Sequence, residues 1–259
     1  MTVFYKQTAI HFEVFGEGDT LVLLHGFLED SRIWKPFIPE FSKKHQVVAI
    51  DLFGHGKTGK VDEIHTMEEM AEAVSEVLDS LDKHSAIIMG HSMGGYVALA
   101  FTELFQEKTN SVILLNSTSK ADSEARKKER DRSINLVEQN KNGFIRMAIG
   151  NLFTAKSREI FQKEVENLIL NAQKLPAENI VASINGMKNR KDRSSILKGF
   201  ERRKVWFAGK EDPIISFDES TKTAEITECQ LVPLPGSHMG FLENRELILA
   251  ETKKIIGLS

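Results

Sequence analysis

The stretch Gly90-His91-Ser92-Met93-Gly94-Gly95 decides the fold expected for this chain. It directly follows a short apolar run, residues 86–89, with the composition of a buried strand, and it opens a segment of helical character, residues 94–105. A Gly-x-Ser-x-Gly sequence between a strand and a helix predicts a sharp turn that holds the serine in strained geometry, its hydroxyl above a sheet. A plain glycine-rich turn with an incidental serine is the alternative.

Short apolar runs rich in β-branched residues alternate along the chain with longer segments of helical period. That alternation predicts an α/β fold in which helices flank a mostly parallel sheet. The expected strands are residues 21–24, 47–52, 86–89, 112–115, 205–208 and 230–232, and the expected helices are 67–81, 94–105 and 245–256. Residues 2–14 alternate polar and apolar side chains instead, which favours an antiparallel hairpin at one edge of the sheet.

The alternation of strand and helix stops between residues 119 and 204. Amphipathic helical patterns occupy residues 134–137, 144–153, 160–170 and 180–187, with breaks at Gly143 and Pro176. We therefore expect a helical cap insertion at residues 119–204, between two parts of one sheet domain at residues 1–118 and 205–259.

Charge and composition limit the classes of function. Hydrophobic residues make up 41% of the 259 residues, and 34 basic residues against 37 acidic ones give a net charge of −3. The segment 119–204 holds 20 basic and 11 acidic residues, a charge of +9, and the remainder, with 14 against 26, carries −12. No overall basic field favours nucleic acid. We expect a small-molecule substrate as the partner, and the mixed signs of residues 126–132 to mark a solvated helix.

Other sequence features bear on location and metal binding. The single cysteine, Cys229, excludes an intramolecular disulfide and a cysteine-based zinc site. The first residues lack the pattern of a secretory signal, and no run of 18 apolar residues occurs. We expect a cytoplasmic protein that binds no membrane, metal ion or cofactor. The sequence does not indicate an oligomeric state.

A serine held on such a turn becomes a nucleophile only with a base and an acid nearby. His238 is the favoured base among eight histidines, because it lies between the last strand and the last helix, where loops leave the carboxyl edge of the sheet. His55 also follows a strand and is the alternative. Asp212 follows the strand at 205–208 and is the expected acid, with Glu211 as its nearest competitor.

The order Ser92, Asp212, His238 along the chain is that of an α/β-hydrolase triad. Backbone donors for an oxyanion are expected at the N–H of Met93, directly after the serine, and of Phe27, in the glycine turn after the first parallel strand.

Taken together, these residues resemble the α/β-hydrolase fold superfamily over nearly the whole chain. The matching stretches are His25-Gly26-Phe27, Asp51-Leu52-Phe53-Gly54-His55-Gly56, Gly90 to Gly95, Asp212 and His238. The resemblance implies a helical cap over the active site, inserted after the sixth strand. Because serine stands at position 92, the chain looks more like the esterases of this fold than like the dehalogenases and epoxide hydrolases, which use aspartate there.

The segment Gly54-His55-Gly56-Lys57-Thr58-Gly59 formally matches a dinucleotide fingerprint. A pyrophosphate site requires a helix that starts at those glycines, and the next helical pattern starts only at Met67. We therefore expect a tight loop beside the site and no nucleotide.

The motifs predict a carboxylesterase-like serine hydrolase that cleaves small, fairly apolar esters or thioesters through an acyl-enzyme intermediate. Carbon-carbon bond hydrolysis, or a lyase reaction of the menaquinone-pathway type, is the alternative on the same three residues. Lyases of that type usually have an arginine at the position of Tyr96, where it holds carboxylates of the substrate. Carbon-carbon hydrolases often have a Gly-Pro-Gly oxyanion loop where this chain has Phe27-Leu28-Glu29. Both differences weaken this alternative. A ligand receptor without catalysis is the third hypothesis.

Overall fold

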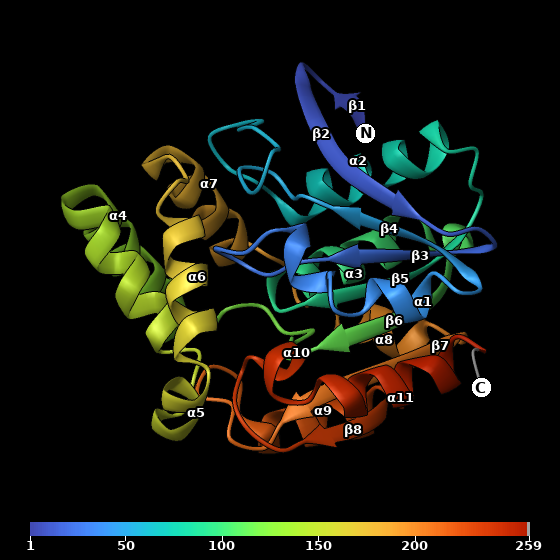
Figure 1. Ribbon diagram of the computed structural model, residues 1–259. Coiled ribbons are helices and arrows are strands. Elements are labelled where there is room, and N and C mark those ends of the chain that lie inside the picture. Colours follow the sequence, from blue (N-terminus) through green and yellow to red (C-terminus); the bar gives the residue numbers. More distant parts are fainter. Residues whose placement is uncertain (258–259) are drawn as a thin grey trace.

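The apolar runs pair side by side into one eight-stranded sheet, in the computed structural model that describes residues 1–257 (Figure 1). The strands are β1 (Thr2–Tyr5), β2 (Thr8–Phe15), β3 (Asp19–Leu24), β4 (His45–Ile50), β5 (Ala86–His91), β6 (Thr109–Leu115), β7 (Arg203–Gly209) and β8 (Gln230–Leu234). All six expected parallel strands are present, five of them longer by a few residues, whereas β4 starts two residues earlier than predicted and ends at Ile50, two residues before the predicted end. The edge hairpin is confirmed as β1 and β2. Its turn includes Lys6, whose φ is 52°.

The strand order, β1-β2-β4-β3-β5-β6-β7-β8, places the site. Strands β3 to β8 run parallel, whereas β1 and β2 pair antiparallel to each other and β2 pairs antiparallel to β4. The chain leaves β3 toward β4 on one side and later returns to β5 on the other side of β3. Ligands of open α/β sheets bind at such a change of direction, outside the carboxyl ends of the strands.

Helices cover both faces of this sheet. In the part outside the cap they are α1 (Ile38–Phe41), α2 (Met67–Ser80), α3 (Met93–Leu104), α9 (Phe217–Ile226), α10 (Gly240–Glu243) and α11 (Arg245–Ile255), with short 3₁₀ turns at Ser31–Trp34 and Gln106–Lys108. Helices α1 and α11 lie on one face, and α2 and α3 lie on the other (Figure 1). Within residues 1–257, none of the helices combines the length and apolarity that a membrane span requires.

Between β6 and β7 the described chain forms helices only. They are α4 (Glu124–Gly150), α5 (Ala155–Ile160), α6 (Gln162–Ala172), α7 (Ala177–Lys188) and α8 (Ser194–Gly199). Helix α4 packs against α6 and α7, and these three lie beyond the sheet edge toward which β3 and β6 point (Figure 1). Helix α8 returns to the sheet and packs against α3. The exact division at residues 119 and 204 stays a prediction.

Helix α4 differs from the sequence prediction in its length and in the position of its break. Helix α4 is longer than expected and kinks at Asn140, where φ is −154° and ψ is 78°, three positions before the expected break at Gly143. The Asn140 side chain accepts a hydrogen bond from the Gly143 N–H at 2.9 Å, so it caps the second half of the helix. The break at Pro176 is confirmed, between α6 and α7.

Helix α9 was not predicted, because it carries no apolar stripe. Its buried residues are small ones, Ser220, Thr223 and Ala224, which fit close against the strands but give no hydrophobic period. The central strands are instead buried on both faces, with Leu21 to Leu24 at 0% exposure. Apolar strands of this kind fix the sheet, and the sheet fixes the ends from which the functional loops leave.

Candidate active site

Ser92 lies on the turn between β5 and α3 in a backbone conformation that side chains rarely adopt. Its φ is 48° and its ψ is −112°. The turn is tight because glycines let the backbones touch: a Cβ on Gly90 would lie 2.2 Å from the Gly94 backbone, and one on Gly94 would lie 2.4 Å from the Leu24 carbonyl oxygen. The strained serine turn is therefore as the sequence predicts, and close backbone approach explains why both neighbouring positions are glycines.

His238 and Asp212 meet Ser92 at the carboxyl edge of the sheet. The Nε2 atom of His238 lies 2.9 Å from the Ser92 hydroxyl oxygen, and its Nδ1 atom lies 2.8 Å from Oδ2 of Asp212. The side chains of His238 and Asp212 are each only 2% exposed. Three residues from three separate strand ends thus form one continuous chain of hydrogen bonds.

The Asp212 carboxylate is held by several donors. Its Oδ1 atom accepts from the N–H groups of Ile214 and Ile215 at 2.8 and 3.0 Å, and its Oδ2 atom also accepts from Nδ2 of Asn116 at 3.1 Å. Burial raises the pKa of Asp212, but the adjacent His238 and the hydrogen bonds lower it more, so its pKa lies below the ordinary value. The carboxyl group is therefore ionised at neutral pH and fixes the imidazole through Nδ1–H.

The two expected oxyanion donors flank the serine. Met93 is the first residue of α3, and Phe27 lies in the loop after β3, next to Leu28, whose φ is 62°. Within residues 1–257, neither the Phe27 N–H nor the Met93 N–H has a protein acceptor. Phe27 lines the cavity that Ser92 also lines, and Met93 directly follows the serine, so their role as oxyanion donors stays a prediction.

Glu29 and His91 join the two loops of the site, and the sequence interpretation missed Glu29. One oxygen of the buried Glu29 carboxylate accepts from the Gly26 N–H at 2.7 Å and lies 2.9 Å from Nδ1 of His91. The other nitrogen of His91 lies 3.1 Å from the carbonyl oxygen of His238. Both ring nitrogens face acceptors, so His91 carries both protons and forms an ion pair with Glu29.

The pKa of His91 agrees with this protonation. Burial lowers it, but the Glu29 carboxylate raises it more, and the net pKa lies above the ordinary histidine value. Asn116, which directly follows β6, was also missed. A polar residue immediately after a buried strand is the signal that could have identified it.

Two other histidines support the loop after β3 and do not face Ser92. His55 accepts from the Leu28 N–H at 3.2 Å, and its Nδ1–H donates to the Phe53 carbonyl at 2.8 Å. His25 likewise contacts the Gly26 carbonyl and the Leu52 N–H. Burial lowers the pKa of His55 to about 3. With both nitrogens engaged, His55 has no free position for a proton from Ser92, and the structure does not support it as the alternative base.

A cavity of about 200 Å³ opens above the serine. Its walls include Phe27 and His238 from the sheet domain and Phe144 and Met147 from α4. The Gly54–Gly59 loop does not line the cavity but lies directly behind it: the His55 ring contacts the Phe27 ring, the Lys57 N–H donates to Asp51, and no helix starts at those glycines. Among residues 1–257, no group of three or more His, Cys, Asp and Glu side chains is arranged to hold a metal ion.

Comparison with known proteins places the chain in a family. Residues 19–245 match the family model of the alpha/beta hydrolase fold. The chain is similar to the dihydrolipoyllysine-residue acetyltransferase component of an acetoin cleaving system from Pseudomonas putida, with 30% identity over 92% of this chain and 63% of that protein. It is also similar to an (E)-2-((N-methylformamido)methylene)succinate hydrolase from Acinetobacter baylyi, with 28% identity over 68% of this chain and 63% of that protein.

Among solved structures, a thermophilic esterase from Thermogutta terrifontis, with malate bound, superimposes with a TM-score of 0.91. It shares 26% identity, and the match covers 98% of this chain and 96% of that one. The matches to the two curated relatives span less than two thirds of those proteins' own length. Fold, site geometry and family model agree: the chain belongs to the alpha/beta hydrolase fold family.

Proposed function

We propose that the protein is a serine hydrolase that cleaves small, fairly apolar carboxylic esters or thioesters through an acyl-enzyme intermediate. The observation that carries the proposal is the hydrogen-bond chain from Ser92 through His238 to Asp212, at the base of a cavity of about 200 Å³. The similarity to a solved esterase supports the same reaction class.

In the first half of the proposed reaction, the Ser92 oxygen attacks the acyl carbonyl carbon and its proton passes to Nε2 of His238. Asp212 holds the proton on Nδ1 and stabilises the imidazolium. The N–H groups of Phe27 and Met93 donate to the oxyanion. When the tetrahedral intermediate collapses, His238 gives its proton to the departing oxygen or sulfur, and the acyl group stays on Ser92.

In the second half, a water molecule gives a proton to His238 and its oxygen attacks the acyl carbon. Collapse of this second intermediate breaks the bond to Ser92, and His238 returns the proton to the serine oxygen. The balance is one ester and one water converted to one carboxylic acid and one alcohol, or to a thiol for a thioester.

Labelling by a fluorophosphonate followed by peptide mass spectrometry tests the nucleophile. We expect one label per chain, on Ser92, and loss of about 10⁶-fold in kcat for a short-chain ester in Ser92→Ala. Ser80→Ala, an exposed serine at the end of α2, is the control and should keep both labelling and turnover. Full ester hydrolysis by folded Ser92→Ala would overturn the assignment, and absence of both labelling and turnover would favour a ligand receptor.

A further inference from the structure

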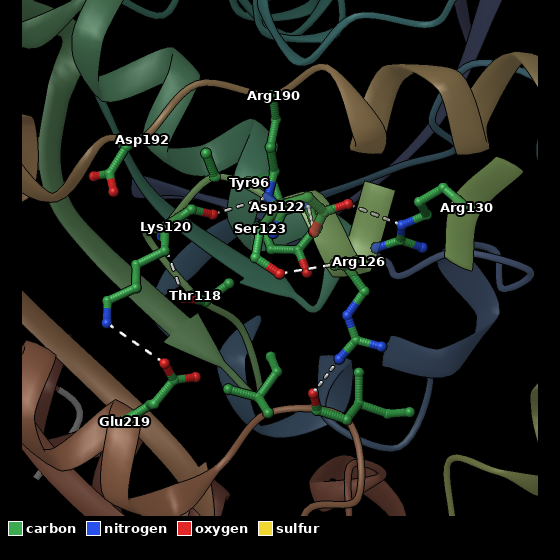
Figure 2. A pocket seen from close by; sticks show the side chains of 13 residues that line it. Tyr96, Thr118, Lys120, Asp122, Ser123, Arg126, Arg130, Arg190, Asp192 and Glu219 are labelled. Atoms are coloured by element: carbon green, nitrogen blue, oxygen red, sulfur yellow. Dashed lines mark hydrogen bonds and ion pairs between the residues drawn. The ribbon is translucent and has the colours of Figure 1, made fainter. Parts of the chain in front are cut away.

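A second cavity, of about 320 Å³, adjoins the one above Ser92 and is rich in basic side chains (Figure 2). Its cations are Lys120, Arg126, Arg130 and Arg190. They come from the loop after β6, from α4 and from the chain just after α7. Two of them, Arg126 and Arg130, also line the cavity that contains Ser92. The basic residues of α4 therefore face the site as well as the solvent.

Charges in the centre of this cavity do not cancel. The Asp122 carboxylate, 3% exposed, lies between two guanidinium groups: Oδ1 is 2.6 Å from Nη1 of Arg190, and Oδ2 is 3.1 Å from Nε of Arg130. One negative charge thus opposes two positive charges in a largely buried position. A single further anion would neutralise the group, which favours a monoanionic ligand.

Two of the three guanidinium nitrogens of Arg190 are occupied by the protein. Nε donates to the carbonyl oxygen of Lys120, Nη1 bonds to Met187 and Asp122, and the guanidinium lies 4.2 Å from the centre of the Tyr96 ring. Arg190 therefore holds the wall of the cavity in place, and more of the free capacity lies with another arginine.

Arg130 has that capacity. Only Nε of Arg130 bonds to the protein; its Nη1 and Nη2 atoms have no acceptor among residues 1–257, although the side chain is only 20% exposed. Arg126, 41% exposed, donates from Nη2 to the carbonyl of Ile214 and from Nη1 to the exposed Glu129, so it contributes a charge and one unused nitrogen, Nε. Both arginines line the cavity that Ser92 also lines.

Besides Asp122 and Glu129, which pair with Arg130 and Arg126, the acidic groups nearby lie where they do not oppose these two arginines. Glu219 lies 3.7 Å from Lys120, and Asp192 accepts from the Ser194 N–H; both line the second cavity only (Figure 2). Glu29, the acidic residue of the Ser92 cavity, is paired with His91. On the Ser92 side, the uncompensated charge is therefore positive.

We propose that Arg126 and Arg130 bind a carboxylate group of the substrate, so that the preferred substrates are small esters with an apolar body and one carboxylate-bearing end. The inference rests on the proposed function, because it names the substrate class of the same site. A guanidinium with two unused nitrogens matches the two oxygens of a carboxylate.

The kinetic test compares esters of equal length. Monoethyl adipate carries the carboxylate on its acyl part and 4-acetoxybutanoate carries it on its alcohol part; ethyl hexanoate and butyl acetate are their uncharged counterparts. We expect kcat/KM of the wild type to be about 10- to 100-fold higher for at least one charged ester than for its counterpart, as a hydrogen-bonded charge pair implies. The two pairs tell which end of the substrate binds the arginines.

Arg126→Gln and Arg130→Gln should each lower kcat/KM for the preferred charged ester far more than for its uncharged counterpart, mainly through KM, so that most of the preference is lost. Arg126→Gln removes no partner of Asp122, so it keeps the test valid if loss of the Asp122 partner unfolds Arg130→Gln. The matched control is Arg132→Gln, which removes the same charge from an exposed position of α4. A wild type without preference, or a preference that survives both variants, would overturn the proposal.

A binding measurement separates this inference from the catalytic proposal. Titration calorimetry on Ser92→Ala, with monoethyl adipate, ethyl hexanoate and inorganic phosphate as ligands, does not depend on turnover. We expect monoethyl adipate to bind at least about 10-fold more tightly than ethyl hexanoate, and Arg130→Gln or Arg126→Gln in the same background to remove most of the difference. Equal binding of the two esters, or binding of phosphate alone, would refute carboxylate recognition even if ester hydrolysis is confirmed. Selective binding of monoethyl adipate without turnover by the wild type would refute only the hydrolase.

Discussion

The carboxyl edge of the sheet and the helices above it contribute to the site in different ways. At the edge, main-chain geometry positions the reacting atoms: Ser92 lies on a turn with positive φ, and Gly94 touches the Leu24 carbonyl. In the helices, the side chains that face the cavity, such as Phe144 and Arg130, depend on how α4 kinks and packs. Chemistry is therefore encoded in local sequence, and the choice of substrate in contacts between distant segments.

Two buried histidines show the same contrast in their protonation. His91, at the sheet edge, pairs with Glu29, which raises the pKa of His91 and favours its charged form. His65 joins the sheet domain to α7. The Nδ1 atom of its ring lies 3.1 Å from the Ser183 hydroxyl, and its backbone N–H donates to the carbonyl of Ala182. Burial lowers the pKa of His65 to about 4, so it is neutral at pH 7. Lowering the pH should therefore weaken the contact at His65, whereas raising the pH should weaken the contact between His91 and Glu29.

After Ser92→Ala, the most damaging change at the sheet edge that leaves the backbone intact is Asp212→Asn. The amide no longer fixes the proton on Nδ1 of His238, so we expect kcat to fall about 10⁴-fold with an unchanged circular dichroism spectrum. Glu211→Gln, at the exposed neighbouring position, is the control and should retain activity. The reverse result would assign the acid to Glu211.

Gly94→Ala tests how rigidly the edge is built. The new methyl group would lie 2.4 Å from the Leu24 carbonyl oxygen, which the sheet holds in place, so we expect a loss of about 3 kcal/mol in the free energy of unfolding. Gly199→Ala, at the end of α8, has no atom within 4 Å and should change that free energy by less than about 1 kcal/mol. Denaturant titration measures both; similar values for the two variants would contradict a rigid edge.

Acid titration should weaken the joint at His65. The unfolded chain takes up a proton near pH 6.5 and the folded protein only near pH 4, so stability falls as pH decreases through this range. The pKa difference corresponds to roughly 3 kcal/mol. We expect His65→Gln to flatten the dependence of unfolding free energy on pH between 6.5 and 4, whereas His84→Gln, at an exposed position, leaves it unchanged. An unaltered slope in His65→Gln would show that other groups dominate.

Glu29→Gln tests the charged pair at the edge. The raised pKa of His91 means that the pair stabilises the fold fully below about pH 6.5 and progressively less as pH rises through the raised value. The difference in unfolding free energy between wild type and Glu29→Gln should therefore be larger at pH 6 than at pH 9. Because Glu29 also holds the Gly26 N–H, we expect kcat/KM to fall by about 10-fold. A difference that grows with pH would contradict an ionised pair.

The sequence was sufficient to predict much of the sheet edge. Ser92, His238 and Asp212 each follow an apolar run, and parallel strands bring their carboxyl ends to one edge, so the juxtaposition follows from order along the chain. The hairpin and the segment of helices between β6 and β7 were also predictable, from alternation and from the loss of the strand pattern.

The rest depends on tertiary contacts. Glu29 shows no pattern in sequence, because its role requires His91 to lie beside it across 62 positions. The mixed charges of residues 126–132 predict a solvated helix, and no local signal separates Arg126 and Arg130 from their exposed neighbours. The kink at Asn140 similarly reflects a side-chain cap that Gly143 alone does not reveal.

The segment that follows β6, residues 116–122, contacts the Asp212 carboxylate, the serine turn and the arginines of the second cavity. Asn116 donates to Asp212, the Ser117 hydroxyl donates to the Ser92 carbonyl, and Asp122 lies between the arginines of the second cavity. For protein engineering, this makes the segment a poor place to join a transplanted cap from another family member. A chimera joined within this segment would change the hydrogen bonds that hold Ser92 and Asp212 at the same time as it changes the cap. A junction after Asp122 would preserve those hydrogen bonds.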